Sequence, residues 1–327
     1  MLQKYLIIIT AFIFGSCALS TTKECIKVRG ALDIGSGSTK IKVAKVNVCS
    51  KKIITILMED SLPVMYADDL RNSDKFSNTI LQNGTAVIKK LLEKAFEFKP
   101  DRVTGVATAA FRKAKNSKIF LDELYKKFNF KVLIANHKLE AELGYLGVQS
   151  KVDDKNIVVW DIGGGSMQIT SKVDNRYSYY LDKLASVKFK DIVIEDIQGS
   201  NLKEKKSPNP ISKKEMESSI NYSKKYSKKV PELLRSQIGQ LKKVYGIGGV
   251  HRYSILNQLK STKNTYSIKE LISTVHTSID KTDAQINSKY YKTEITNLAL
   301  VLGFMQGLGI NQVIVLKINL TDALLLN

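Results

Sequence analysis

The sequence predicts an α/β protein made of two similar domains, and three observations support this fold class. The chain has 327 residues, 43% of them hydrophobic, which is enough for two domains with ordinary cores. The segment Ala31–Val43 reappears as Val159–Ser171, with Asp, Ile, Gly, Gly, Ser and Ile at matching positions. Strand and helix patterns alternate after each copy. We therefore expect a duplicated unit, with one copy in each domain.

Each copy of the repeat predicts a β-hairpin, in which an apolar strand ends at aspartate, a glycine- and serine-rich turn follows, and an alternating strand leaves the turn. In the first half we expect further strands at Lys52–Met58, Arg102–Ala107 and Phe130–Ala135 and a helix at Ser77–Phe98. In the second half we expect strands at Lys155–Ile162, Met167–Val173, Arg176–Leu181, Val244–Ile247 and Gln312–Ile318, helices at Ser212–Leu234 and Thr293–Leu308, and a surface loop at Gly199–Pro210. Domain I should cover residues 26–148 and domain II residues 149–327. We leave open whether a C-terminal helix packs on domain I.

The start of the chain predicts an export signal, not a fold element. Lys4 precedes an apolar run over Tyr5–Phe14, and Gly15 and Ser16 precede Cys17. This run of about ten residues is too short to span a bilayer as a helix. Small residues directly before a cysteine resemble a bacterial lipobox, although phenylalanine stands where leucine is usual. We expect residues 1–16 to be removed and Cys17 to be lipidated; cleavage with release and an uncleaved anchor remain alternatives. The protein would then lie in the periplasm or cell envelope, where a substrate from the cytoplasmic nucleotide pool is not required.

Cys25 and Cys49 lie almost symmetrically about the turn at Ser36 and Gly37. A hairpin folded at that turn brings them near each other, at a separation that suits a disulfide, and an exported protein meets an oxidising compartment. The alternative is two reduced cysteines at strand ends, because a slip of one residue in register would separate them.

The formal net charge is +20, and removal of a leader that contains only Lys4 would leave +19. Such a charge attracts polyanions in general: phosphate-rich substrates, anionic membranes or nucleic acid. Much of it lies in lysine runs such as Lys203–Lys206, which more often form a solvated surface than a binding patch. We therefore expect no specific nucleic-acid partner. A homodimer is left open.

The two predicted hairpin turns have the composition of phosphate-binding loops. Glycine allows backbone N–H groups to approach an anion closely, and serine hydroxyls add donors. The aspartates would repel phosphate, so their expected role is to hold Mg²⁺ or another divalent cation. Asp33 and Asp161 are the candidate metal ligands, and the candidate phosphate-binding residues are Ser36, Gly37, Ser38, Gly163, Gly164, Gly165 and Ser166.

Four motifs in order resemble the exopolyphosphatase and guanosine pentaphosphate phosphohydrolase (Ppx/GppA) family. They are the two turns beginning at Asp33 and Asp161, the Ala-Thr…Arg…Ala…Asn segment over Ala107–Asn116, and the Glu-Ala-x-Leu-x-Tyr-x-Gly-Val helix over Glu140–Val148. The resemblance covers most of the mature chain. It implies two ribonuclease H-like domains of the actin-like ATPase kind, from the actin–hexokinase superfamily, with a phosphate-binding cleft between them.

The resemblance also implies roles for individual residues. Glu140 would activate the attacking water and Arg112 would bind the phosphate that is cleaved, because a carboxylate can accept a proton from water and a guanidinium matches phosphate oxygens. Taken alone, Glu140 would read as a surface carboxylate and Arg112 as an ion-pair partner. Gly248 and Gly249 match a further phosphate-binding turn more weakly, and the nearby His251 is expected to be structural.

Two positions depart from the family pattern. Gly37 replaces the usual asparagine, and Gln168 stands where the family has glutamate, so Gln168 would position water and bind metal weakly. Glutamine here is similar to the apyrase-type nucleoside triphosphate diphosphohydrolases. We expect hydrolysis of terminal phosphate from inorganic polyphosphate. The alternatives are a nucleoside triphosphate or pppGpp phosphohydrolase, and a non-catalytic polyphosphate-binding envelope protein; a kinase of the superfamily is disfavoured.

Overall fold

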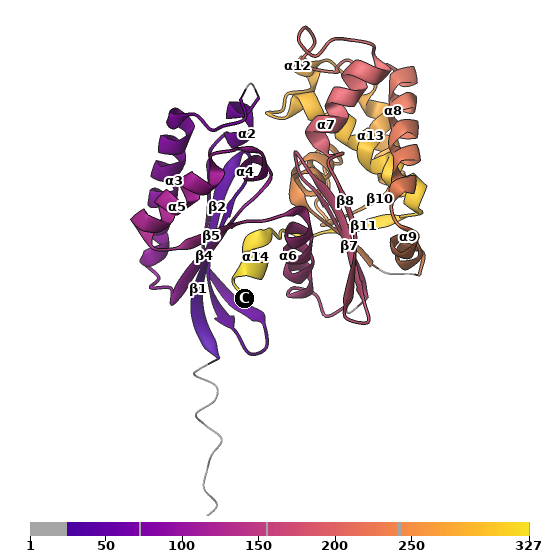
Figure 1. Cartoon of the computed structure of the whole chain (residues 1–327). Helices are drawn as coiled ribbons and strands as arrows, with labels where there is room; N and C mark the ends of the chain where they lie inside the picture. The colour runs from indigo at the N-terminus through magenta and orange to yellow at the C-terminus, as the bar shows by residue number, and fades with distance from the viewer. Residues whose placement is uncertain (1–24, 72, 155, 241–242, 327) are drawn as a thin grey trace, which may run out of the picture.

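The computed structural model describes residues 25–71, 73–154, 156–240 and 243–326. It has two lobes, each built around one β-sheet (Figure 1). The first sheet, in domain I, has the strand order β3-β2-β1-β4-β5. Its strands are β1 (Ile26–Ile34), β2 (Ser38–Asn47), β3 (Lys52–Pro63), β4 (Arg102–Ala107) and β5 (Lys131–Ile134). The helices of this lobe are α2 (Tyr66–Asp69), α3 (Asn78–Phe96), α4 (Ala109–Lys113) and α5 (Ser117–Phe128).

Domain I has its main core on one face of its sheet. The long helix α3 begins where the Ser77 side chain accepts a hydrogen bond from the Ile80 N–H, which satisfies a donor that the first turn leaves free. Its apolar stripe, including Ile88 and Leu91, is buried against β2 and β3. Aromatic rings fill the space beside it, where the Phe111 ring packs against the rings of Tyr66 and Phe76. This packing places the turn that follows β1 at the upper edge of the lobe, near α2 and α4 (Figure 1).

Domain II has a six-stranded sheet with the order β10-β11-β9-β6-β7-β8. Its strands are β6 (Ile157–Ile162), β7 (Met167–Val173), β8 (Arg176–Asp182), β9 (Lys243–Ile247), β10 (Thr265–Ser267) and β11 (Gln312–Val315). Its helices are α7 (Ser186–Ile192), η1 (Val193–Ile197), α8 (Lys213–Tyr226), η2 (Ser227–Lys229), α9 (Glu232–Gly239), η3 (Val250–Ile255), α10 (Leu256–Gln258), α11 (Ile268–Ser278), α12 (Asp283–Ile286) and α13 (Tyr291–Leu308). The apolar α13 is buried along most of its length and forms the centre of this lobe's core.

The two sheets share one pairing pattern, as the repeat predicts. β1 pairs antiparallel with β2 and parallel with β4, and β6 pairs antiparallel with β7 and parallel with β9. In each sheet the hairpin turn therefore lies at the carboxyl end of the first strand. The predicted α/β fold class with two similar domains is confirmed.

Two predicted elements differ from the observed ones. The single helix predicted over Ser212–Leu234 is wrong: α8 ends at Tyr226, and α9 starts after Pro231. The residue before this proline, Val230, has an extended backbone (φ −63°, ψ 125°), because the proline ring disfavours helical geometry there. The last predicted strand also ends early, at Val315, because the chain leaves the sheet and crosses to domain I.

Two helices join the lobes. The helix α6 (His137–Gln149) packs Tyr145 and Val148 against the core of domain II and Leu143 against residues of β4 and α14. The last helix, α14 (Leu320–Leu324), packs on the back of the domain I sheet. Its Asp322 lies 2.7 Å from the Nζ atom of Lys42 on β2, and both side chains are buried. The C-terminal segment is thus fixed to domain I although it follows a strand of domain II.

A disulfide joins Cys25 and Cys49 at the open end of the first hairpin, with their Cα atoms 5.4 Å apart. Residues 1–16 and Cys17, where we predict the export signal and lipid attachment, lie outside the described residues. In the part of the chain that is described, no helix has the length and apolar character needed to cross a membrane.

Candidate active site

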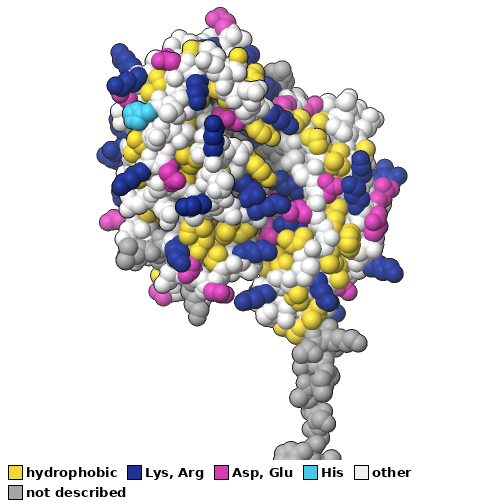
Figure 2. Space-filling view, turned by 180° about the vertical axis from the view of Figure 1, so that it is seen from behind, with side chains coloured by type: hydrophobic (Ala, Val, Ile, Leu, Met, Phe, Trp, Pro, Cys, Tyr) yellow, Lys and Arg dark blue, Asp and Glu magenta, His cyan; other side chains and the backbone are white. Residues whose placement is uncertain are grey.

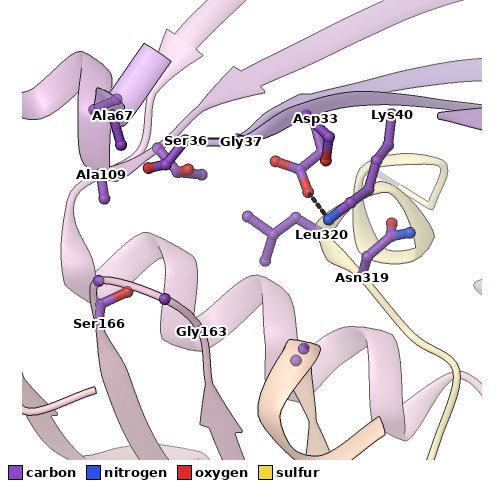
Figure 3. A pocket seen from close by; sticks show the side chains of 18 of the residues that line it. Asp33, Ser36, Gly37, Lys40, Ala67, Ala109, Gly163, Ser166, Asn319 and Leu320 are labelled. Atoms are coloured by element: carbon purple, nitrogen blue, oxygen red, sulfur yellow. Dashed lines mark hydrogen bonds and ion pairs between the residues drawn. The ribbon is translucent and has the colours of Figure 1, made fainter. Parts of the chain in front are cut away.

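A cleft of about 990 Å³ separates the two lobes, and both glycine- and serine-rich turns line it. Ser36 and Gly37 of the first turn lie on one side, and Gly163 and Ser166 of the second lie across from them (Figure 3). Ala109, at the start of α4, lies beside both turns (Figure 3). The fold therefore brings the two predicted phosphate loops to one cavity.

The two turns are closed by the same hydrogen bond. In the first, the Gly35 N–H donates to the Ser38 carbonyl oxygen at 2.9 Å. In the second, the Gly163 N–H donates to the Ser166 carbonyl oxygen at 3.0 Å. The sequence repeat is thus also a repeat of backbone structure.

A second shared bond fixes how each loop faces the cleft. The Ser36 carbonyl oxygen accepts from the Ala67 N–H at 2.9 Å, and the Gly164 carbonyl oxygen accepts from the Val187 N–H at 3.0 Å. These acceptors are therefore engaged by the helix that follows the third strand of each repeat, α2 after β3 and α7 after β8. Because these two carbonyl oxygens are hydrogen-bonded, they repel an anion in the cleft less, and the N–H donors of the loops can bind it.

Asp33, at the end of β1, is paired with a cation of its own hairpin. Lys40 stands opposite Asp33 in the strand register, and its Nζ atom lies 3.4 Å from Oδ2 (Figure 3). The Asp33 charge raises the pKa of Lys40. The other carboxylate oxygen, Oδ1, is buried and has no hydrogen-bond partner among the described residues.

Asp161 occupies the equivalent place in the second hairpin, but its neighbour in the register is the neutral Gln168. Burial raises the pKa of Asp161 to about 7, with further contributions from the nearby carboxylates of Glu140 and Asp33. Gly248 lies against it with a positive φ of 86°, and a Cβ there would lie 2.3 Å from Asp161 Oδ1. Only glycine fits this close approach.

Glu140 faces the cleft from the first turn of α6. The Asn136 side chain caps this helix by accepting from the Leu139 N–H at 2.8 Å, which fixes the start of the helix at His137 and so the position of Glu140 in its first turn. Burial raises the pKa of Glu140, while the charge of Arg112 acts in the opposite direction. The Ser166 hydroxyl lies 3.5 Å from Glu140 Oε1, so the carboxylate reaches the second glycine-rich turn.

Arg112 holds Glu140 in place. Its Nη1 donates both to Glu140 Oε2 and to the Ala135 carbonyl oxygen, at 2.7 Å each. Arg112 is not among the residues that line the cleft, whereas its neighbour Lys113 is. In this conformation Arg112 therefore orients the carboxylate, and its predicted contact with phosphate stays a prediction.

Gln168 and His251 lie behind the cleft surface. Gln168 is buried, does not line the cleft, and its Nε2 has no partner among the described residues. His251 is buried beside Trp160, and its Nδ1 lies 2.6 Å from the Tyr266 hydroxyl. Burial lowers the pKa of His251 to about 3, so the ring is neutral, and it lies against Gly246 of β9, where a Cβ would be 2.8 Å from the ring.

The donor set of the cleft fits a hard cation such as Mg²⁺. Asp33, Asp161 and Glu140 all line the cleft and interact electrostatically, and Asp33 Oδ1 lacks a protein partner within the described segments. No cluster of three metal-binding side chains occurs in the described part of the chain. Mg²⁺ needs only one or two carboxylates when water and phosphate oxygens complete its shell. Asp33 and Asp161 remain the candidate ligands.

Several cleft residues escaped the sequence prediction. Arg252 and Tyr253 follow the Gly248 turn, and that position is the one signal that could have found them. Lys317 reaches the cleft from the C-terminal crossing and lies 2.8 Å from Glu59 of β3. No local pattern predicts Lys317, because its place depends on a contact between residues far apart in sequence.

Two facing domains with matched hairpins define the two-domain, ribonuclease H-like fold of the actin-like proteins. A family model described as the Ppx/GppA phosphatase family matches residues 42–292. The chain belongs to this family, which confirms the resemblance found in its motifs.

Individual relatives agree with this assignment. A guanosine-5'-triphosphate,3'-diphosphate pyrophosphatase from Pseudoalteromonas atlantica is 29% identical over 140 residues, covering 42% of this chain and 27% of the relative. A putative exopolyphosphatase from Haemophilus influenzae is 28% identical over 140 residues, covering 42% of each protein. The match thus spans less than half the length of these curated relatives. The crystal structure of an Aquifex aeolicus Ppx/GppA family member has a TM-score of 0.76 at 18% identity, with 92% of this chain and 97% of that one covered.

Proposed function

We propose that this protein is a phosphoanhydride hydrolase that releases terminal phosphate from inorganic polyphosphate. The observation that carries the proposal is the position of Glu140, which lies in the cleft within 3.5 Å of the loop residue Ser166. A water bound there would lie between a proton acceptor and a phosphate held by the paired loops. The strongly basic chain, with a formal charge of +20, suits a long polyanion.

The reaction would use the cleft residues as follows. Loop N–H groups and the serine hydroxyls bind the oxygens of the terminal phosphate. Water attacks its phosphorus and transfers a proton to Glu140, while the bond between phosphorus and the bridging oxygen breaks. Phosphate and a chain shorter by one unit leave. Arg112 keeps the carboxylate aimed at the water through the 2.7 Å contact.

Asp33 and Asp161 would hold a divalent cation in this site. Such a cation screens phosphate charge and polarises phosphoryl oxygens. The chain's own contribution is to orient these carboxylates. The hairpin ladders do so because Asp33 pairs with Lys40 and Asp161 with Gln168, one residue before β1 and β6 end at the loops.

We further propose that the protein works outside the cytoplasm, anchored through Cys17. The sequence of residues 4–17 supports export and lipidation, and the disulfide between Cys25 and Cys49 suits an oxidising compartment. Inorganic polyphosphate is then favoured over a nucleotide made inside cells.

A nucleotide polyphosphate is the second candidate, and Tyr253 is the observation that favours it. This ring lines the cleft and is 55% exposed, so a base could stack on it while the phosphates lie between the loops. A non-catalytic polyphosphate-binding role remains a third candidate, since Gln168 replaces the family's acid.

One assay separates the three candidates. Phosphate release is measured from polyphosphate, ATP and pppGpp, with and without Mg²⁺, for the wild type and for Tyr253→Ala. We expect Mg²⁺-dependent release that is fastest from polyphosphate and that Tyr253→Ala changes by less than about twofold. Faster release from a nucleotide, with a large loss in Tyr253→Ala, would favour the second candidate. Binding of polyphosphate without release would favour the third.

A further inference from the structure

The lower end of domain I forms a surface that the proposed active site does not use. β1, β4 and β5 are parallel, so their amino ends meet at one edge of the sheet, opposite the edge that carries the phosphate loop. The turn between β2 and β3 lies at the same edge, because Ile26 pairs with Asn47 and Asn47 pairs with Lys52. We call this edge, with the ends of α3 and α5 beside it, the base.

The base exposes large apolar side chains. Phe96 and Phe98, at the end of α3, are 49% and 37% exposed, Ile26 at the start of β1 is 37% exposed, and Tyr125 near the end of α5 is 45% exposed. The turn after α3 is tied to β1, since the Asp101 N–H donates to the Val28 carbonyl oxygen at 2.8 Å. This bond fixes the end of the segment that follows the two phenylalanines beside the first part of β1.

Lysines surround these apolar side chains. Lys51, Lys99 and Lys131 are exposed at turns and strand starts of the base, and Lys127 is exposed in the last turn of α5. The exposed acids Glu97 and Asp101 lie on the same segment as Lys99. Figure 2 shows hydrophobic side chains, with Lys and Arg side chains near them, at the lower end of this lobe. Aromatic rings beside lysines are typical of surfaces that rest in the headgroup region of an anionic membrane.

The place of β1 in the base, together with the predicted lipid attachment at Cys17, favours a membrane as the partner. The described chain begins at Cys25 and Ile26, in the middle of the base, and the apolar run over Tyr5–Phe14 and Cys17 lie just upstream in sequence. A lipid on Cys17 would therefore hold the base against the bilayer by a tether of about eight residues, at most about 30 Å when extended.

We propose that the base of domain I docks on an anionic phospholipid surface, with the phosphate cleft facing away from it. This inference rests on the proposed export but not on the proposed hydrolysis. Docking turns the β1–β2 loop toward the aqueous compartment, because this loop lies at the opposite end of β1 from the base. The β6–β7 loop lines the same cleft as the β1–β2 loop. A single lipid chain holds a protein weakly, and a basic surface supplies the second attachment.

The test uses the protein from residue 18 onward, which has no lipid. Both sheets and all the described core clusters lie within residues 25–326, so this protein retains every described contact. Its binding to phosphatidylcholine vesicles with and without phosphatidylglycerol is measured by co-sedimentation. The base variants are Lys99→Glu with Lys131→Glu, and Phe96→Ser with Phe98→Ser. The control, Lys225→Glu with Lys228→Glu on α8 and η2, makes the same change in net charge on the other lobe.

We expect binding only with phosphatidylglycerol, a loss of about tenfold in each base variant, and a change within about twofold in the control. Phosphate release and the melting temperature should stay at wild-type values in all three variants. Equal losses in the charge-reversed base variant and the control would show attraction by net charge alone and overturn the proposal. So would equal binding to neutral vesicles, or no binding.

Discussion

The two glycine-rich hairpins have the same backbone and different electrostatic surroundings. In the first, Lys40 stands opposite Asp33 and lies 3.4 Å from its carboxylate. In the second, the equivalent place opposite Asp161 holds Gln168, which is neutral and buried. The pKa of Asp161 is raised to about 7 by burial and by neighbouring carboxylates.

The surroundings of the two aspartates therefore carry unequal charge although the loops are duplicated. Asp33 has a countercharge from its own hairpin, while Asp161 has only a weaker, more distant interaction with the same Lys40. A cation that enters the cleft would therefore gain more from Asp161 than from Asp33. Replacement of residues in each hairpin, and a change of pH, test this division between the hairpins.

The first prediction concerns the next pair of equivalent positions, Lys42 and Thr170. Lys42 makes a buried 2.7 Å ion pair with Asp322, so Lys42→Ala leaves an unpaired buried carboxylate and should cost about 3–5 kcal/mol of unfolding free energy. Thr170→Ala should cost about 1 kcal/mol. Urea unfolding measures both. The double variant Lys42→Met with Asp322→Leu should recover most of the loss, and equal costs at the two positions would contradict the difference between the hairpins.

The second prediction concerns the replacement of each aspartate by asparagine. Asp161→Asn should lower kcat/KM for phosphate release about 100-fold, because it removes the charge that lacks a close countercharge. Asp33→Asn should lower it about tenfold, because Lys40 already offsets that charge. Steady-state kinetics at saturating Mg²⁺ measure both variants. A larger loss in Asp33→Asn would reverse the assignment.

The third prediction is a pH dependence of stability without divalent cations. The raised pKa of Asp161 means that the folded chain keeps a proton that the unfolded chain releases near pH 4. The contribution of this proton to the free energy of unfolding is fully present below about pH 4. It is lost as the pH rises to about 7, by at most about 1.4 kcal/mol per pH unit. Wild type minus Asp161→Asn should show this slope in urea unfolding. A flat difference would contradict it.

The fourth prediction concerns Gln168. Gln168→Glu restores an acid beside Asp161, so the Mg²⁺ concentration for half-maximal activity should fall by about threefold. Gln168→Asn, the neutral control, should leave that concentration nearly unchanged. If Gln168→Glu needs the same Mg²⁺ concentration as the wild type, residue 168 does not influence metal binding.

Much of the fold could be predicted because its signals are local. The repeat around Asp33 and Asp161 predicted both hairpins, and strands such as Arg102–Ala107 and Met167–Val173 have the predicted bounds. The break before Pro231 was missed, although proline and the residue before it predict such a break. The apolar and polar pattern continues through it, and that pattern favoured one long helix.

Residues of the candidate site that belong to a local motif could be predicted from the sequence. Residues that reach the site through contacts between distant segments could not. Glu140 and the loop residues line the cleft as expected. The contact of Arg112 with Glu140, rather than with the open cleft, depends on where α4 meets α6. The C-terminal crossing determines where Lys317 lies and brings Asp322 to Lys42, a residue 280 positions away in sequence. Sequence patterns of short range do not contain such information.

The most direct test of the proposed function is phosphate release by Glu140→Gln, because this variant removes the proton acceptor and keeps the shape of the side chain. We expect turnover of polyphosphate to fall at least about 100-fold with unchanged polyphosphate binding. Glu142→Gln, on the same helix and bonded to Tyr179, should keep wild-type turnover. Turnover in Glu140→Gln equal to that of the wild type would contradict the proposal.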